Sequence, residues 1–281
     1  MAGGPDLGQL AGRLARFAGL LVLLYGALLG LMLLTSRSAI YPFLHSEDVR
    51  APTGLADIAL TELEGPHGPV LAWSVPAEAG RPTVLIFVGN AGQLMQGVTR
   101  GAPLVEAGYG IAILNYPGAN GAPGRPGQDT IMAAARTLHD HVVSQSPPQQ
   151  RPIVFGMSLG AAVAAHLAAE QPVSAVVLES PFTSTYELAR DLYPFLPPVN
   201  LLPHNRWPVR AAAPRITAPA LVIHGARDSI VPPPHGERVT EALAGPAELI
   251  VKPEAGHNDL HLHGADAEVM RFLQAQSGRD G

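Results

Sequence analysis

The sequence predicts an α/β fold in which a mainly parallel sheet carries helices on both faces. Short apolar runs of strand length alternate with longer stretches of helical character, the pattern of repeated strand–helix–strand units. The 30 glycines and 28 prolines of this 281-residue chain crowd the segments between these runs, as many turn connections require. The length is sufficient for one sizeable domain and an appendage.

The first element is an apolar segment, residues 17–34, which contains no charge and is long enough as a helix to span about 30 Å of hydrocarbon. A cleaved signal peptide is the alternative, but its apolar core is shorter, about 7–15 residues, and ends at a small-x-small site. We therefore expect residues 1–37 to hold a single membrane anchor. Arg13 and Arg16 favour a cytoplasmic amino terminus and a domain on the non-cytoplasmic side, although Arg37 weakens this bias.

Residues 38–281 are expected to form one domain. Its first two strands alternate in polarity, which is typical of an antiparallel pair, and the later strands are apolar throughout. The predicted strands are 58–63, 70–75, 83–88, 111–115, 152–155, 174–179, 220–224 and 248–251. The predicted helices are 94–107, 129–145, the stretch after Ser158, 237–243 and 265–274.

The pentapeptide Gly-Met-Ser-Leu-Gly at 156–160 follows an apolar run and opens an alanine-rich stretch. This order predicts a strand, a sharp turn and a helix, with Ser158 exposed at the apex as a nucleophile requires. The two glycines leave room for a turn that larger side chains would crowd. A serine with only a structural role in the turn is the alternative.

An acid and a base follow Ser158 along the chain. Asp228 lies in the loop after the run 220–224, and His257 lies in the loop after the run 248–251. All three residues therefore come at the carboxyl ends of predicted strands, where open parallel sheets hold their sites.

These residue types suit nucleophilic catalysis, because a serine hydroxyl is a poor nucleophile without a neighbouring base. We expect His257 to take the serine proton, and Asp228 to fix the tautomer of His257 and stabilise the imidazolium. The oxyanion of a tetrahedral intermediate needs hydrogen-bond donors. The expected donors are the backbone N–H of Leu159 and that of Asn90, in the loop after the run 83–88.

Two site alternatives stay open at the level of sequence. Glu179 ends the strand after the nucleophile, where some hydrolases keep their acid, and Asp228 would then be a turn cap. His257, His261 and His263 form a histidine cluster, but no matching carboxylate cluster accompanies it. We therefore expect surface histidines here and no bound metal.

Two further patterns are interpreted as structural. His224 ends a strand beside the acid loop and is expected to be structural rather than catalytic. Gly118, Gly121 and Gly124 match neither the dinucleotide nor the P-loop spacing, so they indicate no phosphate site.

Composition excludes other classes of function. The net charge of −5 argues against nucleic-acid binding, which needs a basic patch. The chain has no cysteine, which rules out disulfides, thiolate catalysis and cysteine-ligated zinc. The proposed chemistry requires no cofactor.

Residues 181–219 are longer than a simple crossover and are rich in aromatic and aliphatic side chains. We expect a small lid that supplies an apolar acyl pocket. The alternative is that these side chains only pack the excursion onto the domain. The large apolar residues are Phe182, Tyr186, Leu192, Tyr193, Phe195, Leu196, Leu201, Leu202 and Trp207.

Six motifs in order carry a family resemblance. They are Gly-Asn-Ala-Gly at 89–92, Asn-Tyr-Pro-Gly at 115–118, Gly-Met-Ser-Leu-Gly at 156–160, Glu-Ser-Pro-Phe-Thr-Ser at 179–184, His-Gly-Ala-Arg-Asp at 224–228 with Ile-Val-Pro at 230–232, and Gly-His-Asn at 256–258. Over residues 40–275 the chain resembles the α/β-hydrolase superfamily, in particular membrane-anchored serine hydrolases that include protein depalmitoylases and their bacterial relatives. The resemblance implies the α/β-hydrolase fold. The family usually has histidine where Val88 stands and arginine where Pro117 stands.

The expected function is a serine hydrolase that cleaves carboxylic esters or thioesters through an acyl-enzyme on Ser158. Its substrate would be a small-molecule or lipid-like acyl compound. A serine peptidase or amidase on the same fold is one alternative. The other is a non-catalytic, membrane-tethered interaction module, which would have no need of the three residues.

Overall fold

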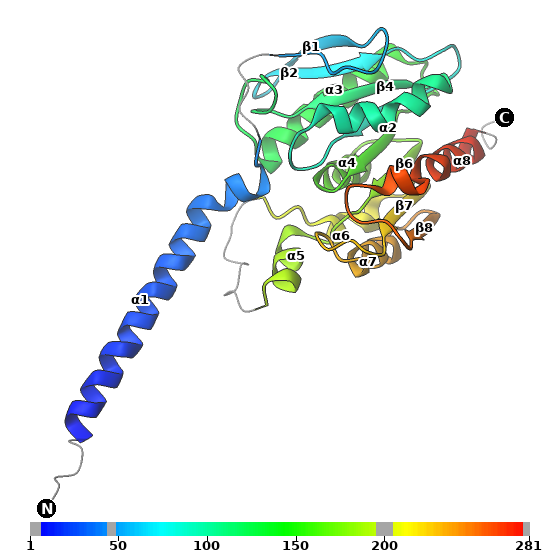
Figure 1. Ribbon diagram of the computed structural model, residues 1–281. Coiled ribbons are helices and arrows are strands. Elements are labelled where there is room, and N and C mark those ends of the chain that lie inside the picture. Colours follow the sequence, from blue (N-terminus) through cyan, green and yellow to red (C-terminus); the bar gives the residue numbers. More distant parts are fainter. Residues whose placement is uncertain (1–6, 44–48, 195–204, 278–281) are drawn as a thin grey trace, which may run out of the picture. The chain divides into compact units, whose positions relative to one another are not determined.

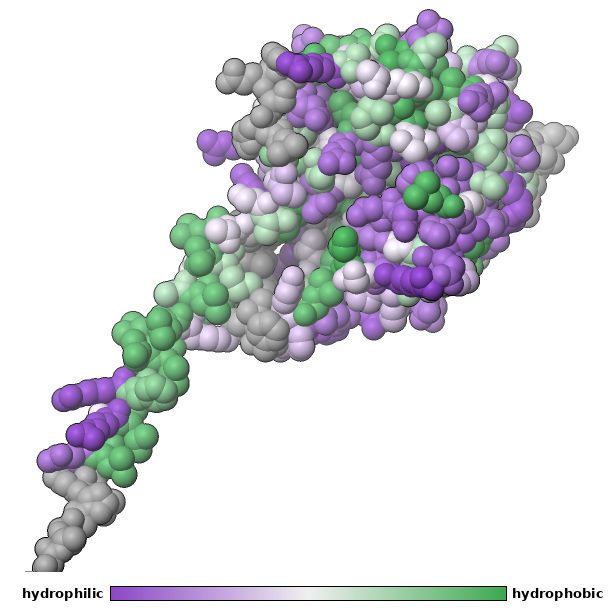
Figure 2. Space-filling view, in the orientation of Figure 1, coloured by the Kyte–Doolittle hydropathy of each residue, from purple (hydrophilic) through white to green (hydrophobic). Residues whose placement is uncertain are grey.

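The computed structural model describes residues 7–43, 49–194 and 205–277, and the chain divides into two units at Ile40 and Tyr41. The first unit holds one helix, α1 (Leu7–Ile40), which includes the whole predicted apolar run. Its stretch Gly8–Met32 is long and apolar enough to cross a membrane and is not buried in protein. Figure 2 shows hydrophobic surface along most of α1. The predicted helix is confirmed and fits a transmembrane helix.

The second unit is built on an eight-stranded sheet in the order β1-β2-β4-β3-β5-β6-β7-β8 (Figure 1). β1 and β2 form an antiparallel hairpin, β2 pairs antiparallel with β4, and all later pairs are parallel. The predicted mainly parallel sheet is confirmed. The strands are β1 Ala59–Gly65, β2 Gly68–Val75, β3 Thr83–Phe87, β4 Gly110–Asn115, β5 Ile153–Met157, β6 Ala175–Glu179, β7 Ala220–Gly225 and β8 Ala247–Lys252.

The central strands are apolar at almost every position because helices cover both faces of the sheet. Every residue of β4, β5, β6 and β7 is buried, whereas the edge strands β1 and β8 have no buried residue. The chain passes from β3 to β4 toward one edge of the sheet, and then from β4 across β3 to β5 toward the other edge. Because crossovers between parallel strands are right-handed, the connecting helices α2 and α3 lie on opposite faces.

The helix contacts agree with this arrangement. α4 contacts α3 and α6 on one face, and α2 contacts α8 on the other. The helices are α2 Leu94–Glu106, α3 Gln128–Gln145, α4 Leu159–Glu170, α5 Thr185–Leu192, α6 Val209–Ala212, α7 Pro234–Ala242 and α8 Ala265–Ser277, with short 3-10 helices η2 Ala213–Arg215 and η3 Leu260–His263.

The predicted lid, 181–219, is described in part, because residues 195–204, with Phe195, Leu196, Leu201 and Leu202, lie outside the described residues. Phe182 and Trp207 are buried in the domain. The indole Nε1 of Trp207 donates to the hydroxyl of Tyr41 at 3.0 Å. The packing alternative therefore holds for these two aromatics. In contrast, α5 has no buried residue, and Tyr193 after it is exposed.

Candidate active site

Ser158 occupies a sharp turn between β5 and α4. Its φ of 53° and ψ of −113° lie in a region that side chains other than glycine rarely adopt, so the turn is strained. Its N–H donates to the carbonyl of Glu179 at 2.9 Å, and its own carbonyl accepts from Ala161 at 3.0 Å. These bonds to the neighbouring strand and helix fix the strained backbone.

The two glycines of the motif are required by close backbone packing. A Cβ on Gly156 would collide with the carbonyl group of Gly160, and a Cβ on Gly160 would collide with the carbonyl group of Phe87. No side-chain movement relieves either collision, because the opposing atoms belong to the backbone. The turn is thus pressed directly against the end of β3.

Ser158, His257 and Asp228, which come from three separate loops, are connected by hydrogen bonds. Nε2 of His257 lies 2.9 Å from Oγ of Ser158, and Nδ1 of His257 lies 2.6 Å from Oδ2 of Asp228. The side chain of His257 is 8% exposed and that of Asp228 is fully buried. The three residues that the sequence singled out therefore form one contiguous relay.

The acid loop and the histidine loop are bound to each other through backbone. The N–H of Arg227 donates to the carbonyl of Ala255 at 2.9 Å, and a Cβ on Gly225 would collide with the carbonyls of Ala255 and Gly256. Gly256 donates its N–H to Oδ1 of Asp259 at 2.7 Å. Glycine at position 225 lets the two loops approach closely enough for the carboxylate of Asp228 to reach His257.

Asp228 is held in its ionised form. Its Oδ1 accepts the backbone N–H groups of Ile230 and Val231 at 2.9 and 2.8 Å. Burial would raise the pKa of Asp228, but hydrogen bonds from His224, His257 and Val231 outweigh burial and hold the pKa well below its usual range. Because an ionised carboxylate can only accept hydrogen bonds, the proton of the neutral His257 ring lies on Nδ1, which faces Asp228. Nε2 is then free to accept the serine proton.

Glu179, the alternative acid, is engaged elsewhere. Its buried carboxylate forms an ion pair with the buried Arg100. Nε and Nη2 of Arg100 both lie 2.9 Å from Oε2 of Glu179. Burial raises the pKa of Glu179 even though Arg100 opposes the shift. The hydrogen bond to Nδ1 of His257 belongs to Asp228.

The loop that carries Asn90 lies beside the serine turn. Gly160 packs against the carbonyls of Phe87 and Val88, which immediately precede the loop. Leu159 is the first residue of α4, where a backbone N–H has no partner within the helix. The start of α4 and the loop after β3 are thus neighbours. The role of the Leu159 and Asn90 N–H groups as oxyanion donors stays a prediction.

Three further residues, which sequence reasoning did not assign to the site, shape its loops. Gln96 accepts the N–H of Gly89 through Oε1 at 2.8 Å, and the hydroxyl of Tyr116 donates to the carbonyl of Val88 at 2.7 Å. Both bonds fix the loop that holds Asn90. The third residue is His224, which is buried beside Asp228. The Tyr116 motif was visible in the sequence, whereas nothing local pointed to Gln96.

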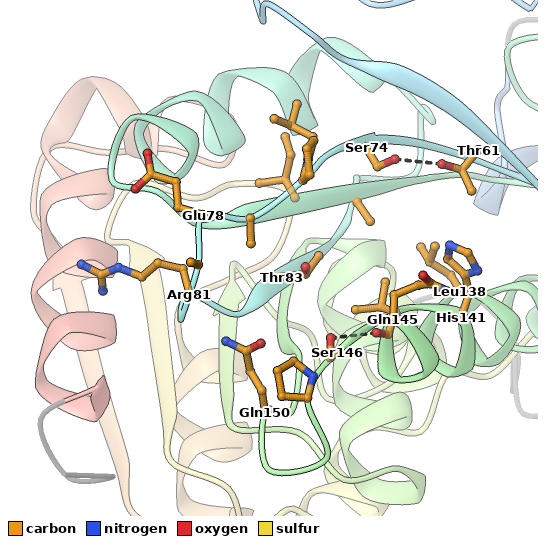
Figure 3. Close-up of a pocket in the computed structure, with 18 of the residues that line it drawn as sticks. Thr61, Ser74, Glu78, Arg81, Thr83, Leu138, His141, Gln145, Ser146 and Gln150 are labelled. Carbon is orange, nitrogen blue, oxygen red and sulfur yellow. Dashed lines mark hydrogen bonds between the residues drawn. The ribbon is translucent and has the colours of Figure 1, made fainter.

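A cavity of about 490 Å³ opens at the opposite end of the strands from Ser158, near the start of β3 and β4. Figure 3 shows its polar side chains, among them Thr83, His141 and Gln150, with a hydrogen bond between Ser74 and Thr61. None of the relay residues lines it. Among the described residues, no group of three His, Cys, Asp or Glu side chains is arranged to hold a metal ion.

A serine at a strained strand–helix turn, with its base and acid on loops after later strands of a mainly parallel sheet, is the arrangement of the α/β hydrolases. Residues 82–199 match the α/β hydrolase fold family, and residues 202–278 match a family described as TAP-like protein. The chain belongs to the α/β-hydrolase superfamily.

Similar proteins occur in bacteria and eukaryotes. An uncharacterized protein of Mycobacterium tuberculosis is 39% identical over 209 residues, which cover 72% of this chain and 73% of that one. The α/β hydrolase domain-containing protein WAV2 of Arabidopsis thaliana is 30% identical, with the same coverage of each chain. An uncharacterized membrane protein of Saccharomyces cerevisiae is 26% identical, covering 78% of this chain and 80% of that one. Together with α1, this last likeness supports membrane association.

Solved structures share the fold. The esterase Pf2001 of Pyrococcus furiosus matches with a TM-score of 0.66 at 18% identity, over 82% of this chain and 99% of that one. Acetyl xylan esterase 1 from Thermoanaerobacterium matches with a TM-score of 0.63 at 20% identity, over 80% and 86% of the two chains. These neighbours show the fold, and superfamily membership supports an enzyme of the hydrolase class.

Proposed function

We propose that this chain is a membrane-anchored serine hydrolase that cleaves carboxylic esters or thioesters through an acyl-enzyme on Ser158. The observation that carries the proposal is the relay of two short contacts, from Oγ of Ser158 to His257 at 2.9 Å and from His257 to Asp228 at 2.6 Å. Esterase activity of several fold neighbours agrees with this reaction class.

The first half of the reaction transfers the acyl group to the protein. Oγ of Ser158 attacks the substrate carbonyl carbon while Nε2 of His257 takes its proton. The carbonyl oxygen becomes an oxyanion, which the N–H groups of Leu159 and Asn90 would stabilise. When the intermediate collapses, His257 returns its proton to the departing alcohol or thiol.

The second half releases the acid. Water takes the place of the departed alcohol or thiol, gives a proton to Nε2 of His257 and attacks the acyl carbon. Collapse of the second intermediate breaks the bond to Ser158, and His257 reprotonates Oγ. In both halves, the ionised Asp228 stabilises the imidazolium and keeps Nε2 directed at the serine.

The anchor and the expected lid indicate the class of substrate and the location of the protein. We assign residues 1–37 to a membrane anchor and 38–281 to the hydrolase domain, with the domain on the non-cytoplasmic side because Arg13 and Arg16 precede the apolar run. An apolar, lipid-like acyl substrate suits both a membrane setting and the apolar composition of residues 181–219.

A fluorophosphonate probe tests the nucleophile directly, because it reacts with an activated serine whatever the natural substrate. The full-length protein in detergent micelles should be labelled, and Ser158→Ala should abolish the labelling. Ser184→Ala is a matched control, because Ser184 caps α5 outside the relay. Labelling that persists in Ser158→Ala would place the nucleophile elsewhere.

A panel of p-nitrophenyl esters of increasing chain length, acyl-thioesters and aminoacyl-anilides then identifies the bond that is cleaved. Turnover of esters or thioesters, increasing with chain length, is the expected result. Preferential turnover of anilides would instead identify an amidase.

A further inference from the structure

His224 is a buried histidine that the proposed reaction does not use. It belongs to β7 and is 0% exposed. Its Nε2 lies 2.8 Å from the carbonyl oxygen of Val231, and because a carbonyl only accepts, the ring proton is on Nε2. Nδ1 has no hydrogen-bond partner among the described residues, and α7 passes so close that a Cβ on Gly236 would collide with it.

The proton-bearing nitrogen faces the acid loop. Nε2 of His224 also lies 3.4 Å from Oδ2 of Asp228. The shorter contact with Val231 is the main hydrogen bond, and the contact with Asp228 is a weaker, secondary one. Val231 in turn donates its N–H to Oδ1 of Asp228 at 2.8 Å. Polar contacts therefore connect His224, Val231 and Asp228 in a ring and hold both oxygens of the carboxylate in place.

Two histidines thus direct a nitrogen at one carboxylate oxygen, since Nδ1 of His257 lies 2.6 Å from the same Oδ2. A rotation of the carboxylate would break its contacts with both histidines and with the backbone of Val231. We propose that His224 is a positioning residue that orients the carboxylate of Asp228 toward His257, directly and through Val231. The inference rests on the proposed function.

Packing alone gives no reason for a histidine at this place. An apolar side chain would fill the volume without leaving a buried nitrogen unpaired, which costs free energy. In His224 the unpaired nitrogen faces α7, and the paired nitrogen faces the acid loop. The polar function of the side chain is therefore directed at the acid loop.

Two amide substitutions separate the ring nitrogens. In His224→Gln the amide nitrogen can take the place of Nε2, whereas in His224→Asn it reaches only as far as Nδ1. With full-length protein in micelles, we expect His224→Gln to retain the labelling rate within a few-fold. We expect His224→Asn to lower the labelling rate and kcat about 10- to 100-fold, with little change in KM. Equal rates for the two variants would overturn the inference.

A double-mutant cycle tests whether His224 acts through Asp228. In an Asp228→Asn background, His224→Asn should cause no further loss of labelling. The same fold-loss in both backgrounds would overturn the inference, because His224 would then act on the fold as a whole. His224→Leu, which also lacks the donor, replaces His224→Asn if the latter does not unfold cooperatively.

The two proposals fail in different ways. Absence of labelling in the wild type, or labelling of Ser158→Ala, overturns the proposed function. Labelling that depends on Ser158 and Asp228 but not on the residue at position 224 overturns this inference alone.

Discussion

Nδ1 of His257 and Oδ2 of Asp228 are 2.6 Å apart, the separation of a short charge-assisted hydrogen bond, although the two residues belong to loops after different strands. The contact depends on the close approach of the two loops at Gly225. Asp228 and His257 are therefore positioned by a close backbone contact between their loops as well as by their own hydrogen bond.

Replacement of the acid should remove most of the activity without unfolding the protein. Asp228→Asn can keep the shape of the side chain, but it offers the wrong partner to Nδ1 of His257, so we expect kcat to fall by about 10³- to 10⁴-fold. Turnover of the best ester measures this. Asp140→Asn, at a side chain that is 70% exposed, is the matched control. A loss below ten-fold in Asp228→Asn would contradict the assigned acid.

The depressed pKa of Asp228 also predicts how stability depends on pH. The folded-state pKa lies below the unfolded value of about 3.9, so Asp228 contributes stability that is complete above that value and is lost as pH falls through the folded-state pKa. Between pH 5 and pH 2, the free energy of unfolding measured in urea should therefore fall less steeply with pH in Asp228→Asn than in the wild type. The two slopes should differ by up to about 1.4 kcal/mol per pH unit. Parallel curves would contradict the assignment.

The buried pair of Arg100 and Glu179 should matter for stability rather than for catalysis. Arg100→Met leaves the buried Glu179 carboxylate without its partner, which should cost about 3–5 kcal/mol in the free energy of unfolding. The double variant Arg100→Met/Glu179→Met removes both charges and should recover most of this loss. Chemical unfolding measures both. A Glu179→Gln variant that folds but loses as much activity as Asp228→Asn would contradict a purely structural role for Glu179.

The glycines of the serine turn should tolerate no side chain. Gly160→Ala drives a methyl group into the backbone of β3, which should cost about 3 kcal/mol or more and abolish labelling of Ser158. Gly127→Ala is the control, because its Cβ would meet only ordinary contacts. Normal labelling of Gly160→Ala would mean that the turn relaxes freely.

Much of this architecture was predictable because local pattern and burial agree. The strands β4 to β7 are buried on both faces, so their sequences are continuous apolar runs that stand out against the turns. The contacts of His257 with Ser158 and with Asp228 were predictable from the places of the three residues at strand ends. Their catalytic roles stay predictions.

Other features depend on contacts that leave no local trace. Arg100 and Glu179 lie 79 positions apart, and no periodicity signals a buried ion pair. Tyr41 and Trp207, 166 positions apart, are likewise paired only by the fold. α7 begins at Pro234, earlier than the predicted 237, because proline suits the first turn of a helix.

The location of His257 after β8 has a consequence for inactivation. β8 is an edge strand, paired only with β7 and without a buried residue, so it belongs to the part of the sheet that can open most easily. Detachment of β8 would move His257 away from Ser158 while the interior strands stayed assembled. In a denaturant titration, turnover should thus disappear at a lower concentration than the one that melts the core.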